Sequence, residues 1–279
     1  MQALRLCRTL GTIFTFLFIG FVWGQSEQWE LRVCAEPRSL PFSDRRERGF
    51  ENKIAEILAS ELNARLTYAW LPQPYVIARD IYLETGRCDM VTGIPDGTKP
   101  FLTTLAYYRT SYVFVYQKGG PGEIASFDDS RLKLLEIGVQ SSGSSISPVS
   151  YALAKRGLVE QQHNYRSDFK AANPLAAVVK AVAQDEVDVG IVWGPIAGYF
   201  SQAWTGLEWV PVSPQIERPF IPMTAPISIG LRQGDEDLRD LFDYALVQRW
   251  EDIKAILKAY RVPLGEPQPT KPLLTLGSP

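Results

Sequence analysis

The sequence predicts an α/β protein with two similar lobes, each a mainly parallel sheet flanked by helices. Short apolar runs alternate with segments of helical periodicity, an order typical of parallel strands joined by right-handed crossovers. This alternation begins near residue 31 and begins again near residue 111. The segments 86–93 and 185–192 also share the order of a polar helix end, an Asp and a buried strand. The repetition indicates two βαβ lobes.

The first lobe is predicted to begin as strand–helix–strand–helix–strand. Phe50, Ile54, Leu58 and Leu62 recur at helical spacing, which predicts one buried helix face. The strands are short runs rich in apolar and β-branched residues. The expected elements are strands at 31–35, 65–70 and 89–94, and helices at 50–62 and 76–84.

The second lobe is predicted to repeat this order. Asn173 and Pro174 are expected to open a helix, with Asn as the cap and Pro in the first turn. The run 187–193 is apolar enough for a buried strand. The other expected elements are strands at 111–116, 134–140 and 164–165, and a helix at 149–156.

The end of the chain is expected to return to the first lobe, with a strand at 226–232 and helices from Asp235 to Tyr260. The predicted domain organisation follows from this return. Residues 25–113 and 220–264 form the first lobe, residues 118–212 form the second, and residues 114–117 and 213–219 cross between them. Residues 265–279 are rich in Pro, Gly and Thr and are expected to form a flexible tail.

Residues 1–24 have the layout of a signal peptide. Arg5 and Arg8 precede an apolar stretch that is too short to span a bilayer comfortably, and a small residue, Gly24, precedes Gln25. We expect cleavage between Gly24 and Gln25 and a mature protein that works in the periplasm. An uncleaved N-terminal anchor is the alternative.

The expected mature chain keeps two cysteines and a mildly acidic charge. Loss of Cys7 leaves Cys34 and Cys88, and an even number in an exported protein favours a disulfide over two buried thiols. Loss of Arg5 and Arg8 lowers the net charge from −2 to −4. This balance, without a basic tail, argues against a nucleic-acid surface. No later segment is apolar and long enough to insert into a membrane.

Three segments resemble the type II periplasmic solute-binding proteins of solute-binding protein family 3. They are Gly49-Phe50-Glu51, Gly86-Arg87-Cys88-Asp89 and the run 229–235, all typical of amino-acid-binding members. The resemblance implies an exported protein with two α/β lobes and a ligand cleft between them.

A narrower resemblance is to the binding proteins associated with methanol dehydrogenase, the J proteins of methanol oxidation operons. It covers about residues 29–263, and its most specific motif is Trp193-Gly194-Pro195-Ile196-Ala197-Gly198-Tyr199. It implies as partners a periplasmic dehydrogenase that depends on pyrroloquinoline quinone (PQQ) and its cytochrome c. Whether that dehydrogenase uses calcium or a lanthanide is left open. The serine-rich loop 141–147 departs from the family, so no ligand contact is carried over there.

The strand ends predict a cleft between the lobes, because ligands of open α/β sheets bind beyond the carboxyl ends of the strands. Most of the residues expected there are aromatic, and for any one of them a place in a lobe core is an equally open interpretation. Ser141 and Ser142 either offer donors to an anion or belong to a plain helix cap. The candidate cleft residues, for a ligand or a partner, are Glu36, Phe42, Trp70, Tyr75, Asp96, Tyr107, Tyr108, Arg109, Gln140, Ser141, Ser142, Trp193 and Tyr199.

A free amino acid is not the expected ligand. The resemblance places an Arg for the α-carboxylate in the segment 96–101, where this chain has Lys99-Pro100 instead. It places a carboxylate for the α-ammonium where this chain has Gly194-Pro195. Ligand charges buried without partners would cost several kcal/mol. Arg109 is a candidate for an anion contact from another direction.

The sequence favours a binding protein over an enzyme. His163 is the one histidine and lies among polar neighbours, so we expect it at the surface. No nucleophile-elbow, metal-ligand or phosphate-loop pattern is present. A lyase that uses Glu36 or Asp96 is the third hypothesis. The first is a non-enzymatic periplasmic accessory protein of methanol oxidation, without a cofactor, that supports assembly or activation of the quinoprotein dehydrogenase. The second is the substrate-binding protein of an ABC importer for a small ligand that is not an amino acid.

Overall fold

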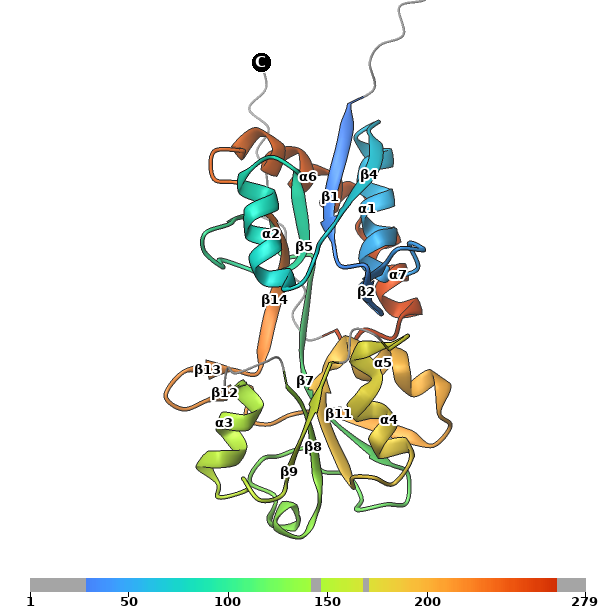
Figure 1. The fold of residues 1–279 in the computed structure, drawn as a ribbon, viewed down its shortest axis with the longest axis vertical. Coiled ribbons are helices and arrows are strands. Elements are labelled where there is room, and N and C mark those ends of the chain that lie inside the picture. Colours follow the sequence, from blue (N-terminus) through green and yellow to red (C-terminus); the bar gives the residue numbers. More distant parts are fainter. Residues whose placement is uncertain (1–28, 142–146, 168–170, 265–279) are drawn as a thin grey trace, which may run out of the picture.

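One long strand, β7 (Tyr108–Gln117), runs through both lobes of the molecule and joins their sheets (Figure 1). The computed structural model describes residues 29–141, 147–167 and 171–264. The predicted signal peptide and tail therefore lie outside the described residues. Within them the fold is the expected one, with two α/β lobes and the first lobe completed by the end of the chain.

The first-lobe sheet has the order β4-β1-β5-β14-β7. Strand β1 (Glu30–Ala35) runs parallel to β4 (Arg65–Trp70) and to β5 (Met90–Pro95). Strand β14 (Thr224–Leu231) lies antiparallel between β5 and β7, and the short β6 (Leu102–Thr103) pairs with its end. The C-terminal strand thus occupies the middle of this sheet.

Helices cover both faces of the first-lobe sheet. On one face, α1 (Phe50–Glu61), α6 (Glu236–Gln248) and α7 (Trp250–Ala259) contribute Phe50, Phe242 and Leu257 to a core with the strands. On the other face, α2 (Tyr75–Glu84) packs through Ala78 and Leu83 against β1 and β5. A small hairpin of β2 (Arg38–Ser39) and β3 (Ser43–Asp44) follows β1.

The second-lobe sheet has the order β7-β10-β8-β9, with β11 on the other side of β7. Strand β8 (Ile137–Ser141) runs parallel to β10 (Val189–Trp193) on one side and to β9 (Gln162–Arg166) on the other. Strand β11 (Leu207–Pro211) is antiparallel to β7. Helix α3 (Pro148–Lys155) covers one face and α4 (Ala177–Ala183) the other.

Helix α5 (Gly194–Phe200) follows β10 directly and was not expected from the sequence. Gly198 lies in close contact with the segment after α7, so that a Cβ atom there would be 1.9 Å from the carbonyl oxygen of Arg261. The glycine of the most specific motif therefore allows a second-lobe helix to approach the end of the first lobe. Three short 3-10 helices, η1 (Ser130–Leu134), η2 (Pro174–Ala176) and η3 (Ser201–Ala203), complete the second lobe.

The first crossing between the lobes lies within β7. Ser111 pairs with Thr224 of β14, and the next residue, Tyr112, pairs with Trp193 of β10. The expected crossing at 114–117 lies further along β7, where the strand already pairs with β10 and β11. The difference arises because one continuous strand serves both sheets, so no loop marks the boundary.

The second crossing contains a hairpin of β12 (Ile216–Glu217) and β13 (Ile221–Pro222). Glu217 is buried there and accepts hydrogen bonds from Lys155, the last residue of α3, and from Arg156 after it, each at 2.7 Å. Burial alone would raise the pKa of Glu217, but these two cations hold it below its usual value. The ion cluster fixes the hairpin to the second lobe.

Candidate functional site

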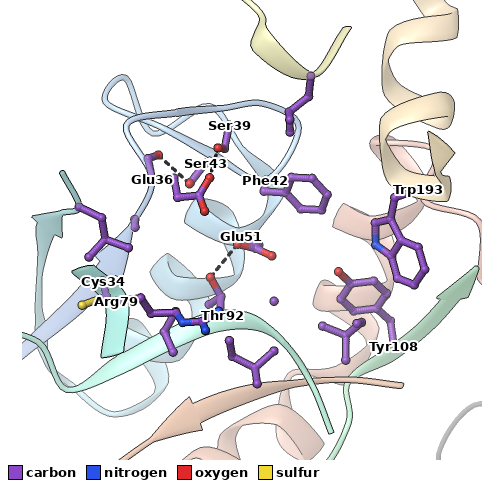
Figure 2. A pocket seen from close by; sticks show the side chains of 17 residues that line it. Cys34, Glu36, Ser39, Phe42, Ser43, Glu51, Arg79, Thr92, Tyr108 and Trp193 are labelled. Carbon is purple, nitrogen blue, oxygen red and sulfur yellow. Dashed lines mark hydrogen bonds between the residues drawn. The ribbon is translucent and has the colours of Figure 1, made fainter. Parts of the chain in front are cut away.

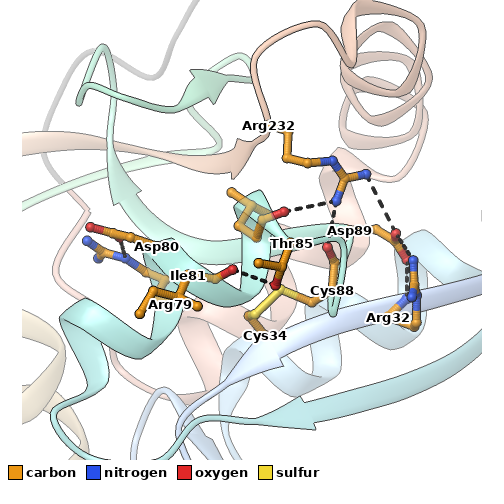
Figure 3. Close-up of a disulfide and its surroundings, with 10 residues drawn as sticks. Arg32, Cys34, Arg79, Asp80, Ile81, Thr85, Cys88, Asp89 and Arg232 are labelled. Carbon is orange, nitrogen blue, oxygen red and sulfur yellow. Dashed lines mark hydrogen bonds and ion pairs between the residues drawn. A yellow bond between two sulfur atoms is a disulfide. The ribbon is translucent and has the colours of Figure 1, made fainter.

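A disulfide joins Cys34 of β1 to Cys88, which lies between α2 and β5 (Figure 3). The predicted pairing is confirmed, because β1 and β5 are neighbours and bring the two Cα atoms to 5.5 Å. Arg232 supports the same turn by donating to the carbonyl oxygen of Cys88 at 2.8 Å. Arg32 donates to Asp89, the next residue, at 2.6 Å. The bond and these contacts hold the start of β5, whose far end lines the site.

A wide cavity of about 740 Å³ lies between the lobes. The first lobe contributes the start of α2 and the end of β1, and the second lobe contributes the carboxyl ends of β8, β9 and β10. Both polar and apolar side chains reach it. The lining residues are Glu36, Gln73, Pro74, Tyr75, Val76, Tyr112, Val139, Gln140, Ser141, Ser147, Val149, Arg166, Ser167, Leu175, Ile191 and Trp193.

A smaller cavity of about 290 Å³, which we call the inner cavity, lies against the first lobe (Figure 2). It shares Glu36, Leu175 and Trp193 with the wide cavity, so the two adjoin. Its lining comes from the end of β1, the β2–β3 hairpin, α1, α2, β5, the starts of β7 and β14, and the second-lobe residues Leu175 and Trp193. The residues are Cys34, Ala35, Glu36, Ser39, Phe42, Ser43, Glu51, Leu71, Arg79, Val91, Thr92, Gly93, Ile94, Tyr108, Leu175, Trp193 and Ile227.

Glu51, near the start of α1, places a carboxyl group in the inner cavity. Only 8% of the residue is exposed, and its Oε2 accepts a hydrogen bond from the Thr92 hydroxyl at 2.7 Å. Its Oε1 lies beside Gly93, where a Cβ atom would come within 2.5 Å. Burial raises the pKa of Glu51 to about 7, and the Thr92 hydrogen bond opposes part of that rise. Glu51 thus changes charge near neutral pH.

Glu36 supplies a second carboxyl group from the end of β1. Its side chain accepts a hydrogen bond from Ser39, and its backbone carbonyl accepts one from the Ser43 hydroxyl at 2.8 Å. Burial raises the pKa of Glu36, while the Ser39 hydrogen bond and the charge of Arg79 oppose the rise. The hairpin after β1 therefore fixes this side chain at the border of both cavities.

Arg79 of α2 is the cation among the residues that line the inner cavity. Its Nε donates to Asp80 at 3.0 Å, and its guanidinium lies 4.9 Å from the centre of the Phe101 ring. Two carboxyls and one paired guanidinium give this cavity an excess of acidic groups.

Aromatic rings form the opposite wall of the inner cavity, with Phe42, Tyr108 and Trp193 on the side away from Arg79 (Figure 2). The Trp193 ring also packs edge-on against Tyr112, with centroids 5.0 Å apart. Figure 2 shows the Tyr108 hydroxyl turned toward Glu51. Burial is the main reason that the pKa of Tyr108 is raised well above its usual value, and the neighbouring Tyr107 and Glu51 add to the rise. This hydroxyl therefore stays neutral.

The structure brings seven of the candidate residues to these cavities. Glu36 and Trp193 line both of them. Phe42 and Tyr108 line the inner one, and Tyr75, Gln140 and Ser141 line the wide one. Ser142 lies outside the described residues. Ser147, at the end of the serine-rich loop, caps α3 by accepting from the Ser150 backbone N–H at 3.0 Å.

Five other candidates lie elsewhere. Tyr107 is 2% exposed and belongs to the first-lobe core. Trp70 stacks on Tyr68 at the end of β4, and Tyr199 stacks on Tyr260 beside α7. Asp96 and Arg109 line a polar groove next to α6. Side chains alternate along β7, so Arg109 points away from the cavity that its neighbour Tyr108 lines.

Glu51, Arg79 and Thr92 were not among the candidates from the sequence. Glu51 follows Phe50 at the start of an amphipathic helix, where a carboxylate is usually solvated. A glycine inside a strand, Gly93, is the signal for a close approach at this point. The glycine predicts that another group comes close to the strand, but the sequence does not show that this group is Glu51.

The histidine and the possible metal ligands of the described residues can be placed directly. His163 is an exposed side chain that contacts Glu136, as expected for a surface histidine. Within 29–141, 147–167 and 171–264, no cluster of three or more His, Cys, Asp or Glu side chains could hold a metal ion. In the same residues no helix is long and apolar enough to cross a bilayer. The site itself holds one buried carboxyl, Glu51, and one partly buried carboxyl, Glu36, in a partly aromatic cavity that could hold a ligand.

Comparison with known proteins places the chain in a family. Protein MoxJ of Methylorubrum extorquens (strain AM1) is 30% identical over 248 residues, which are 84% of this chain and 81% of that protein. The chain belongs to the MoxJ family. MoxJ of Paracoccus denitrificans is 28% identical over 245 residues, or 84% of this chain and 88% of that one. No family model matches the sequence.

Solved structures agree with membership of the MoxJ family. The periplasmic binding protein XoxJ from Methylobacterium extorquens AM1 is 35% identical, with a TM-score of 0.70 over 85% of this chain and 100% of that one. MxaJ from Methlophaga aminisulfidivorans MPT is 24% identical and shares the fold, with a TM-score of 0.75 over 84% and 100% of the two chains. The predicted resemblance and the periplasmic binding protein fold are confirmed.

Proposed function

We propose that this protein is a non-enzymatic periplasmic accessory protein of methanol oxidation, which supports assembly or activation of a PQQ-dependent methanol dehydrogenase. The observation that carries the proposal is its membership of the MoxJ family together with its 35% identity to the periplasmic binding protein XoxJ. The dehydrogenase, and with it its cytochrome c, is the proposed partner. Cleavage after Gly24 would release the mature protein to the periplasm, and mass spectrometry of periplasmic protein tests that step.

The rim of the cleft offers a contact surface for this partner. Val76 and Ile77 of α2 are 62% and 58% exposed, and Val76 lines the wide cavity with Tyr75. Ile81, one helical turn further, is 49% exposed. Exposed apolar side chains that gather in one patch commonly mark a site of protein–protein contact. We therefore propose that the dehydrogenase, or an intermediate in its assembly, docks on this rim.

A deletion strain tests the proposal. Without the gene, and with no second copy present, active dehydrogenase in the periplasm and growth on methanol should fall. Complementation with the wild-type gene should restore both. Full activity and normal growth in the deletion strain would contradict the accessory role.

Variants in the complemented strain test the docking surface. Val76→Asp should restore activity poorly, because it places a charge on the apolar rim without disturbing a buried residue. Trp193→Ala should also restore dehydrogenase activity poorly. Leu134→Asp is the matched control, since Leu134 is 88% exposed on η1 in the second lobe. Equal complementation by Val76→Asp and Leu134→Asp would exclude the rim as the contact surface.

The second candidate is a receptor that delivers a small ligand to an ABC importer. The observation that favours it is the inner cavity with its buried Glu51. Recovery of the dehydrogenase with the tagged protein supports the accessory role. Loss of uptake of a defined ligand in the deletion strain, with normal dehydrogenase activity, supports the receptor role.

A further inference from the structure

We propose that the inner cavity binds a small organic cation of the ammonium type. The carboxyl groups of Glu36 and Glu51 would neutralise its charge, and the rings of Phe42, Tyr108 and Trp193 would surround its alkyl groups. This inference concerns the ligand alone, and it holds whether the protein serves a dehydrogenase or an importer.

The first support is a buried carboxyl that faces the cavity. Thr92 holds Oε2 of Glu51 at 2.7 Å, which fixes the side chain. Oε1 lies next to Gly93, where any side chain would collide with it. Because Gly93 has no side chain, the carboxyl group can occupy this place in the cavity lining. An ionised carboxylate buried in this way is unfavourable unless a cation approaches it. A bound ammonium group would supply that cation.

The second support is the balance of charges around the cavity. Glu36 and Glu51 both line it, and the negative charge of Glu36 makes ionisation of Glu51 less favourable. Arg79 compensates one charge at most, and Asp80 already pairs with it at 3.0 Å. When both carboxyls are ionised, a monocation would therefore bring the site closer to neutrality, whereas an anion would add to the acidic excess.

The third support is the aromatic wall opposite Arg79 (Figure 2). Aromatic faces attract cations, and the attraction is larger where water is excluded. Three rings on one side and carboxyls on the other suit a ligand that is both charged and alkylated. A metal ion would gain nothing from the rings and would prefer more oxygen ligands.

The size of the cavity limits the ligand. About 290 Å³ is at the lower end of the range of small-molecule sites. A compact ammonium ion fits within the inner cavity alone, while a larger ligand would extend into the adjoining wide cavity. An amino acid would bring a carboxylate close to Glu36 and Glu51.

Isothermal titration calorimetry of the mature full-length protein with choline tests the inference. The matched neutral probe is 3,3-dimethylbutan-1-ol, which has the same shape without the charge. The titration is made at pH 8, where a pKa of about 7 leaves Glu51 mostly ionised. We expect choline to bind at least about tenfold more tightly than the neutral alcohol.

Variants identify the residues responsible. Glu51→Gln should weaken choline binding by about tenfold or more and leave binding of the neutral alcohol unchanged. Glu36→Gln should act in the same direction. Glu251→Gln is the control, because Glu251 lies on α7 with its side chain 79% exposed. Thermal melting of each variant confirms that it is folded before titration.

Three outcomes would overturn the inference. The first is equal affinity for choline and the neutral alcohol. The second is tighter binding of acetate than of any cation, which would make Arg79 the determinant. The third is no binding of choline, tetramethylammonium or methylammonium below about 10 mM. A loss of dehydrogenase activity in the deletion strain would bear on the proposed function alone.

Discussion

Gly198 and Arg261 approach so closely that a Cβ atom on Gly198 would lie 1.9 Å from the Arg261 carbonyl oxygen. The contact joins α5 of the second lobe to the turn after α7 of the first. Arg261 itself has a φ of 53°, a conformation that limits how far this backbone can retreat. Packing between the lobes therefore gives a physical reason for the glycine in the segment 193–199.

Gly198→Ala should destabilise the protein by about 1–3 kcal/mol, the usual effect of adding a methyl group to a packed site. Denaturant unfolding of the two proteins measures the difference. Ala203→Ser, on the exposed η3 segment nearby, should change stability by less than about 0.5 kcal/mol. An unchanged midpoint for Gly198→Ala would mean that α5 and the Arg261 turn are not held at this distance in solution.

Reduction of the Cys34–Cys88 disulfide should lower the free energy of unfolding by roughly 3–5 kcal/mol, because the bond closes a loop between residues 54 positions apart. The Cys34→Ser, Cys88→Ser double variant should show the same loss in urea unfolding without a reductant. Thiol labelling of the denatured, unreduced protein should find no reactive thiol in the mature chain. Two reactive thiols per chain would contradict the bond.

Glu51 should make stability depend on pH. Its pKa is raised from 4.5 to about 7 on folding, so the folded state holds the proton more tightly than the unfolded state. The stabilising effect is complete below about pH 4.5 and is lost as the pH rises through about 7. The difference in unfolding free energy across this window should be about 3 kcal/mol.

Glu51→Gln isolates this effect from the other groups that titrate. The titratable groups that interact with Glu51 are Glu36, just after β1, and Tyr107 and Tyr108 at the start of β7, and both tyrosines stay neutral over this range. Between pH 5 and pH 8, the free energy of unfolding measured in urea should fall less for Glu51→Gln than for the wild type. Glu251→Gln should show the same fall as the wild type. Parallel pH profiles for wild type and Glu51→Gln would show that Glu51 has an ordinary pKa.

Amino acids and methanol should not stabilise the protein. A ligand of the native state at a hundredfold excess over its Kd adds about 2.7 kcal/mol, which raises the Tm by several degrees for a chain of this size. Lys99-Pro100 and Gly194-Pro195 offer no anchors for the α-carboxylate and α-ammonium, and methanol has too few atoms to bind tightly. A reproducible rise in Tm with any standard amino acid would refute this expectation and favour the importer role.

Hydrophobic periodicity was sufficient to predict most of the fold. The expected strand at 65–70 coincides with β4, and Phe50, Ile54 and Leu58 are fully buried on α1 as their spacing indicates. Helix α5 was missed because Gly194-Pro195 reads locally as a turn and because its small residues lack an amphipathic pattern. Their packing depends on Arg261, which is distant in sequence.

Local pattern predicted the candidate site less well than the fold. Glu36 and Trp193 were found because they lie at predicted strand ends, and Phe42 because aromatic residues were expected around the cleft. Glu51 was missed because its burial is produced by Thr92 and Gly93, which belong to a strand some forty residues later. Asn173 was expected to cap a helix through its side chain, yet it makes no such hydrogen bond, and the chain enters α4 through the 3-10 turn η2.

The central position of β14 makes completion of the first-lobe sheet depend on a late part of the chain. The sheet β4-β1-β5-β14-β7 has a gap in its middle until residues 224–231 have left the ribosome and reached the folding compartment. The second-lobe strands β8 to β11 precede β14 in the chain, so that lobe can form first. Without residues 224–231, β5 and the first four residues of β7 would lack their shared partner, while the rest of β7 would still pair with β10 and β11.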